Sequence, residues 1–155
     1  MKENKVIRAV ILILIIMVFT GCGITSSTRT NTYIVKDIND NKVKINVILN
    51  TLGGYKLSVD SPFEIKKDGE TLSYGKFIYA EYYDDFLEEV ENNDKTEILD
   101  KGEEENYEYI FYNYDNSEYD YVILIKDSGI AVILANAESE KNAKEIFERL
   151  SFEKG

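Results

Sequence analysis

The chain has 155 residues, with 18 Lys and Arg against 29 Asp and Glu, so its formal net charge is −11 at pH 7. It has no histidine and a single cysteine. So acidic a surface argues against nucleic-acid binding, the missing histidine removes the commonest general base, and one cysteine leaves no disulfide within the chain.

The first 21 residues have the features of a secretory signal peptide. Lys2, Lys5 and Arg8 precede an unbroken apolar run of eleven residues, Ala9–Phe19. Eleven helical residues cover about 16 Å, whereas the hydrocarbon core of a bilayer is about 30 Å thick. The run is therefore short for a stable membrane span, and the segment predicts export.

The apolar run ends in Val18-Phe19-Thr20-Gly21-Cys22, which resembles the lipobox of bacterial lipoproteins. The resemblance implies that the Cys22 thiol receives a diacylglyceryl group and that a peptidase then cleaves between Gly21 and Cys22. Two acyl chains anchor a protein stably where one is marginal. We therefore expect a protein anchored by membrane lipid on the extracytoplasmic face of a cell membrane. The alternatives are a signal peptide with an incidental Cys22 and an uncleaved anchor.

The rest of the chain is expected to form a short tether and one domain. Residues 22–32 are mostly small and polar, which predicts a flexible tether. Residues 33–155 fit a single domain that buries enough surface to fold without a metal or a disulfide.

Alternating apolar residues predict strands in the first half of the domain. Turns are expected at Asp40-Asn41, Gly53-Gly54 and Lys67-Asp68-Gly69, and Pro62 interrupts one strand. The predicted strands are Tyr33–Ile38, Val43–Leu49, Tyr55–Val59, Phe63–Ile65 and Tyr74–Tyr79.

The apolar period then changes to that of a helix with an acidic opposite face. The residues of this apolar stripe are Tyr79, Tyr82, Tyr83, Phe86, Leu87 and Val90. A short strand at Ile98-Leu99 follows. A meander of three antiparallel strands is then predicted at Tyr107–Tyr114, Tyr119–Ile125 and Ile130–Ala137. Val122–Ile125 and Ile130–Ala135 are apolar on both faces, as central strands covered on both sides would be.

A C-terminal amphipathic helix is predicted after Ser139, which has the side chain of an N-cap. Its apolar stripe is Ala143, Ile146, Phe147 and Leu150, and its i,i+4 ion pairs are Glu140 with Lys144 and Glu145 with Arg149. We expect Ile146 and Phe147 to be buried against Val132 and Leu134 or their neighbours, and Phe152 to hold the end of the helix. The expected fold is α+β: an antiparallel sheet of about six to eight strands with the two helices packed on it.

The order of helix, short strand, meander and final helix resembles the PsbP-like fold. The resemblance covers Tyr55 to Phe152 and rests on element order and on the closing residues Ala143, Ile146, Phe147, Leu150, Ser151 and Phe152. It implies an antiparallel sheet with helices on its faces and, by analogy, a binding or assembly role.

Six tyrosines crowd the first hairpin of the meander: Tyr107, Tyr109, Tyr112, Tyr114, Tyr119 and Tyr121. Alternation puts Tyr107 and Tyr109 on one face and Tyr112 and Tyr114 on the other. Tyrosine favours strands and packs across them, which explains the cluster by itself. The functional hypothesis is a partly exposed aromatic surface for a protein partner or a glycan.

A calcium site and an enzyme are both weakly supported. Asp37-x-Asn39-x-Asn41 matches the first ligands of an EF-hand loop, but Lys42 and Ile48 stand where that loop needs Gly and Glu. A polar turn is therefore expected there, with no metal and no cofactor. With Cys22 consumed by lipid, no thiol nucleophile is expected, and the sequence has no phosphate loop or Gly-x-Ser-x-Gly.

We therefore expect a non-catalytic lipoprotein with a binding or assembly role. The first alternative is a solute- or calcium-binding accessory module. The second is an enzyme that uses paired carboxylates, although the acids around Asp84 and Glu88 are read as a solvated helix face.

Overall fold

The computed structural model describes residues 27–136 and 139–155. The expected signal peptide, its cleavage position after Gly21 and the lipidated Cys22 lie outside the described residues. The described chain is mixed α+β and its sheets are antiparallel, as expected. The single sheet of six to eight strands is wrong, because the ten strands divide into sheets of three and seven.

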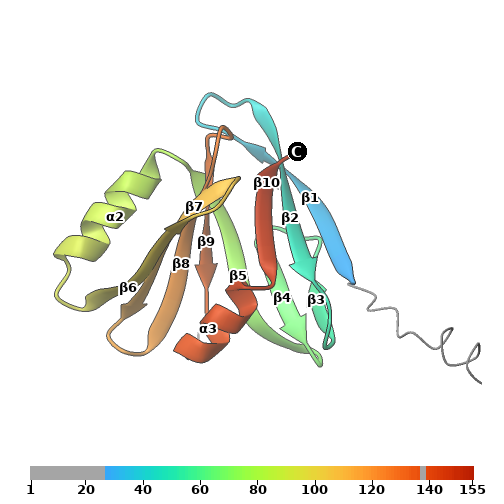
Figure 1. Cartoon of the computed structure of the whole chain (residues 1–155). Coiled ribbons are helices and arrows are strands. Elements are labelled where there is room, and N and C mark those ends of the chain that lie inside the picture. The colour runs from blue at the N-terminus through green and yellow to red at the C-terminus, as the bar shows by residue number, and fades with distance from the viewer. Residues whose placement is uncertain (1–26, 137–138) are drawn as a thin grey trace, which may run out of the picture.

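The smaller sheet joins the two ends of the described chain (Figure 1). It contains β1 (Thr28–Lys36), β2 (Lys42–Asn50) and β10 (Leu150–Lys154), with β2 in the middle. The expected turn between the first two strands is present: the Asp37 carboxylate accepts hydrogen bonds from the backbone N–H groups of Asn39 and Asn41 at 2.9 and 2.8 Å.

Two interpretations at the chain ends are corrected by this sheet. Residues 28–32 do not belong to a tether, because their backbone pairs with residues 46–50 of β2. The last helix stops at Phe147, and Leu150 and Phe152 lie in β10 rather than on the helix or at its end. A spacing of two between these residues puts both on one face of a strand, and each is buried there.

The larger sheet has the strand order β3-β4-β5-β9-β8-β7-β6. Its strands are β3 (Tyr55–Leu57), β4 (Phe63–Lys67), β5 (Glu70–Tyr79), β6 (Thr96–Glu103), β7 (Tyr107–Tyr114), β8 (Glu118–Ile125) and β9 (Ile130–Ala135). The predicted meander is confirmed, since β7 pairs with β8 and β8 with β9. β8 and β9 are interior strands, as their two apolar faces predict.

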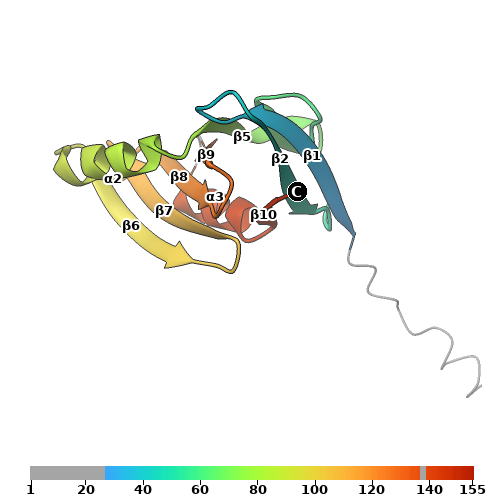
Figure 2. The same cartoon turned by 90° about the horizontal axis from the view of Figure 1, so that it is seen from above.

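The two helices lie on opposite sides of this sheet, as Figure 2 shows from above. α2 (Tyr82–Asn92) packs on one side, over a small cluster that includes Tyr83, Val90 and Val122. It begins later than predicted, because Tyr79 is the last residue of β5. α3 (Glu140–Phe147) and the three-stranded sheet lie on the other side. A much larger cluster of buried residues fills the space between these two elements and the seven-stranded sheet.

α3 begins as the sequence predicts. The Ser139 side chain accepts a hydrogen bond from the backbone N–H of Asn142 at 3.3 Å. Both predicted ion pairs are present, at 2.7 Å for Lys144 with Glu140 and 3.4 Å for Arg149 with Glu145.

Candidate functional site

The six tyrosines of the meander do not form one exposed surface. Tyr107, Tyr112 and Tyr121 are buried, whereas Tyr109 and Tyr119 are half-buried and Tyr114 is exposed. The predicted alternation holds, because Tyr112 belongs to the cluster under α2 while Tyr107 and Tyr121 belong to the cluster on the opposite side. Packing across strands therefore explains most of this tyrosine content, and the hypothesis of a broad tyrosine surface is wrong for the buried three.

Phe147, in the last turn of α3, packs against three tyrosines on the α3 side of the seven-stranded sheet. Its ring stacks on Tyr121 with 4.0 Å between centroids and an angle of 10° between the planes. The Tyr109 ring lies 4.7 Å away and the Tyr107 ring 6.2 Å away, the latter edge-on. Ile146 is buried as expected, in the same cluster as Val132 and Leu134. Phe147 packs on Tyr121, the cross-strand neighbour of Leu134, but it is only half-buried.

These four rings line an open groove of about 500 Å³ between α3 and the sheet, here called the aromatic groove. Its other lining residues are Asp100, Glu104, Lys144, Glu148 and Leu150. Asp100 belongs to β6. Because it pairs with Phe111, it lies on the same face of the sheet as Tyr107 and Tyr109. Strands β6 to β8, α3 and the start of β10 thus contribute to one concave surface.

Tyr109 is positioned by a glycine and a carboxylate. A Cβ atom on Gly102 would lie 2.5 Å from the Tyr109 ring, so only glycine lets the ring lie against β6. The Tyr109 hydroxyl donates a hydrogen bond to Asp100 Oδ2 at 3.1 Å. Burial, together with this hydrogen bond, raises the pKa of Tyr109. The hydroxyl therefore stays protonated at neutral pH and keeps its donor.

The charge around the aromatic groove is mainly negative. Three exposed carboxylates, on Asp100, Glu104 and Glu148, stand against the single ammonium of Lys144. Among the described residues no Lys or Arg forms an ion pair with these three acids, and Lys144 is already paired with Glu140. The groove therefore combines the exposed parts of the Tyr109 and Phe147 rings with carboxylates that have no cationic partner in the described chain.

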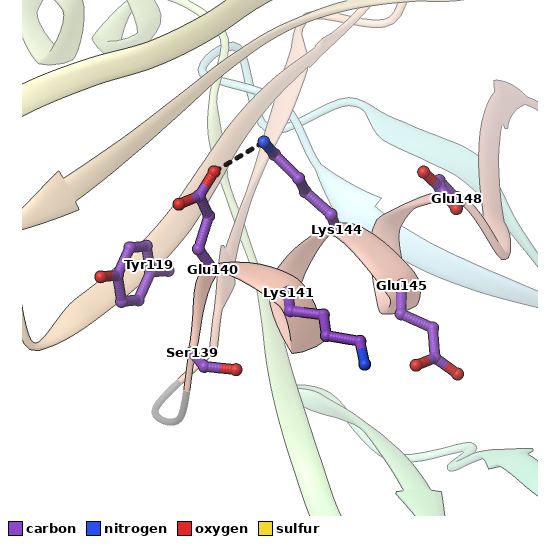
Figure 3. A pocket seen from close by; sticks show the side chains of 7 residues that line it. All are labelled: Tyr119, Ser139, Glu140, Lys141, Lys144, Glu145 and Glu148. Carbon is purple, nitrogen blue, oxygen red and sulfur yellow. Dashed lines mark hydrogen bonds and ion pairs between the residues drawn. The ribbon is translucent and has the colours of Figure 1, made fainter.

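In a wider hollow next to the aromatic groove, the lining side chains do not point toward a common centre. This hollow is lined mainly by α3, with Tyr119 at its side. Figure 3 shows Glu140 and Lys144 joined on one side of the helix, whereas Lys141 and Glu145 point to the other side. Because these side chains diverge, they offer no common point for a ligand, and the aromatic groove is the better candidate site.

The acids elsewhere do not gather into a metal centre within the described residues, where no group of three potential metal-ligating side chains occurs. The Asp37 carboxylate, from the EF-hand-like stretch, is occupied by the hydrogen bonds of its own turn, including one from the Asn41 side-chain amide at 3.0 Å. These bonds, led by that amide, lower the pKa of Asp37.

Sequence reasoning identified three tyrosines of the groove but missed Phe147 as their centre and the acids Asp100, Glu104 and Glu148. The spacing of the tyrosines predicted which of them share a face of the strand, but it did not indicate which helix covers that face. No signal in the sequence indicated this, because the predicted stripe continued past Phe147 to Leu150.

Comparisons with known proteins found no matching family model, no matching curated protein and no matching solved structure. Within the described residues, neither helix is long and apolar enough to cross a bilayer.

Proposed function

We propose that this protein is a lipoprotein, held on the extracytoplasmic face of a cell membrane by lipid on Cys22, with a non-catalytic binding role. The lipobox-like stretch supports the anchor. The observation that carries the binding role is the aromatic groove, where Tyr107, Tyr109 and Tyr121 surround Phe147 beside carboxylates that have no cationic partner among the described residues. The groove binds a cationic group on a protein partner.

The chemistry of the groove favours a cation over a neutral or anionic group. The face of an aromatic ring attracts an ammonium or guanidinium group, by about 0.5–1 kcal/mol at exposed sites. Carboxylates that no described Lys or Arg pairs with add a Coulombic attraction that salt screens. An anion would meet three carboxylates and one lysine that is already paired. A lysine or arginine side chain on an exposed segment of the partner fits both parts of the groove.

We further propose that the domain is related to PsbP-like proteins, as the order of α2, β6, the meander and α3 suggests. The closing Leu150-Ser151-Phe152 departs from the expected pattern, since these residues form a strand and not a helix end. Binding or assembly at a membrane surface agrees with this relationship by analogy alone.

The binding proposal is tested by titration calorimetry on the detergent-extracted full-length protein. Short peptides that carry lysine or arginine are compared with their acetyl-lysine or citrulline counterparts, and with free arginine amide as a small cation. We expect heat from the cationic peptides only, with an affinity that falls as salt is raised. Equal binding of the neutral counterparts would contradict the proposal, and binding of free arginine amide alone would indicate a solute-binding protein.

Matched variants locate the binding. Glu148→Gln and Asp100→Asn each remove one exposed negative charge from the groove, so we expect an affinity about threefold to tenfold lower, with the fold intact. Glu89→Gln removes an equally exposed charge from α2, on the opposite side of the sheet, and should leave the affinity unchanged. The same loss in all three variants would place the interaction in the general negative field rather than in the groove.

The anchor is tested separately by intact mass spectrometry of the membrane-extracted protein. The expected mass is that of residues 22–155 plus a diacylglyceryl group, with or without an additional N-acyl chain. Cys22→Ser should incorporate no labelled fatty acid. A native N-terminus beyond Cys22, or a free thiol at Cys22, would contradict the lipoprotein assignment.

A further inference from the structure

The loop between β2 and β3, residues 51–54, is fastened to the start of the described chain. The backbone N–H and the hydroxyl of Thr51 both donate hydrogen bonds to the carbonyl oxygen of Ser27, at 2.7 and 2.8 Å, and the hydroxyls of the two residues are also in contact. The loop therefore stays beside the point where the chain enters the domain.

That point is close to the proposed lipid in sequence. Ser27 follows Cys22 by five residues, and five fully extended residues span at most about 18 Å. With lipid on Cys22, residues 51–54 cannot move far from the headgroups. α2 lies on the opposite side of the molecule from the start of β1, in both Figure 1 and Figure 2.

The loop also presents an apolar side chain at its tip. Leu52 is 42% exposed, and Gly53 and Gly54 beside it are exposed as well. Arg149 donates a hydrogen bond from its guanidinium group to the Leu52 carbonyl at 3.0 Å, while the same group lies over the Tyr55 ring. The loop is thus held from the domain side by Arg149, while the Leu52 side chain stays exposed.

The charge of the chain is divided unevenly between its two halves. This division favours an orientation in which the loop of residues 51–54 faces the membrane. Residues 27–79 contain eight Lys and Arg against six Asp and Glu, whereas residues 80–155 contain seven against 22. An anionic bilayer therefore repels the second segment, whereas the first has a small positive net charge and is not repelled. The first segment carries both the entry point of the chain and the residue 51–54 loop.

We infer that the loop of residues 51–54 is the membrane-contacting edge of the domain, with Leu52 entering the headgroup region of an anionic bilayer. This inference rests on the proposed lipid anchor at Cys22. The tethered edge then faces the lipid, and the acidic helix α2 faces away from it. The anchor supplies the attachment and the loop sets the orientation of the domain.

The test uses the lipidated full-length protein in vesicles of phosphatidylcholine and anionic phosphatidylglycerol that contain spin-labelled lipid. Acylation removes the thiol of Cys22, so a cysteine introduced by Leu52→Cys is the only one that takes up an environment-sensitive fluorophore. Interfacial groups lie about 5–10 Å into the headgroup boundary, so we expect the label at position 52 to be quenched about twofold or more above the control.

Ile38→Cys is the matched control, because Ile38 is also an exposed apolar residue, at 52% exposure. It lies in the turn at the far end of β1, whose nine residues make the strand about 30 Å long. If exposure alone decided insertion, the label at position 38 would be quenched at least as strongly as that at position 52.

The outcomes separate the inference from its premise. Strong quenching at position 52 and weak quenching at position 38 support the membrane-contacting edge. Equal or reversed quenching, in protein whose intact mass includes the lipid, would contradict the membrane-contacting edge but not the lipid anchor. A mass without lipid overturns both.

Discussion

The two faces of the seven-stranded sheet are built very differently. The face toward β10 and α3 has a cluster of 20 buried residues, whereas the face under α2 has five. Burial of apolar surface stabilises a fold by about 25 cal/mol per Å². The α3 face therefore provides most of the stability, and α2 is a smaller addition to the opposite face.

The same comparison explains where the aromatic groove lies. On the α3 side the three-stranded sheet covers one part of the larger sheet, and the short helix α3 covers another. Where α3 ends, the rings around Phe147 are only partly covered. A site for a ligand thus adjoins the most stable part of the molecule, which is how a rigid binding surface is expected to be supported.

The largest effect is expected from Phe152→Ala in β10. Phe152 is 1% exposed and packs edge-on against Tyr107 with 5.6 Å between ring centroids. Removing a fully buried phenylalanine costs about 3–5 kcal/mol of unfolding free energy. Denaturant unfolding of the full chain measures it, and a midpoint near that of the unchanged protein would contradict the dominance of the α3 face.

Phe147→Ala should have a smaller effect, about 2–3 kcal/mol, because the ring is half-buried and its loss leaves a more open space than a core cavity. Its second effect is more specific. Loss of the stacked ring should weaken binding of cationic peptides, which Phe152→Ala need not do in its folded fraction. Calorimetry on Phe147→Leu, which keeps apolar volume without the aromatic face, separates the two effects.

Val90→Ala probes the opposite face. Val90 is 5% exposed in the cluster under α2. The change removes the equivalent of two methylene groups, so we expect a loss of about 1.6 kcal/mol. Denaturant unfolding measures it next to Phe152→Ala. A loss as large as that of Phe152→Ala would show that the α2 face contributes equally.

The smallest expected effect is on a surface carboxylate that ties α3 to β3. The Tyr55 hydroxyl donates a hydrogen bond to Glu145 at 2.6 Å, and this bond, helped by Arg149, lowers the pKa of Glu145 below its ordinary value of 4.5. The contribution of Glu145 to stability is thus present above pH 4.5 and is lost as the pH falls through its lowered pKa. Tyr55→Phe should move this pKa back toward 4.5.

An NMR titration of the Glu145 side-chain carboxyl measures the shift, with Glu140 as the internal control, because its partner Lys144 does not change. An unchanged pKa of Glu145 in Tyr55→Phe would assign the shift to Arg149 alone.

Local patterns in the sequence determined the type and the approximate extent of most elements. The meander from Tyr107 to Ala135 follows from apolar runs and turn residues, both of which act between near neighbours. The N-cap at Ser139 and the ion pairs of α3 were predictable for the same reason, since each links residues within one helical turn. The buried central strands followed from apolar side chains on both of their faces.

Tertiary structure decided the rest, because pairing between distant segments depends on free energies that no local window contains. Residues 28–32 are as polar as a tether, yet they form an edge strand because β2 offers a full row of backbone partners. Leu150 continues the helical stripe of Ile146 and Phe147, whereas its spacing of two from Phe152 fits a strand, so the local pattern does not decide between the two. Leu150 and Phe152 join β10 because β2, about 100 residues earlier in the chain, exposes an unpaired edge and an apolar face there. The aromatic groove depends on the same pairing, because ending α3 at Phe147 places its ring among the tyrosines of β7 and β8, near Asp100 of β6.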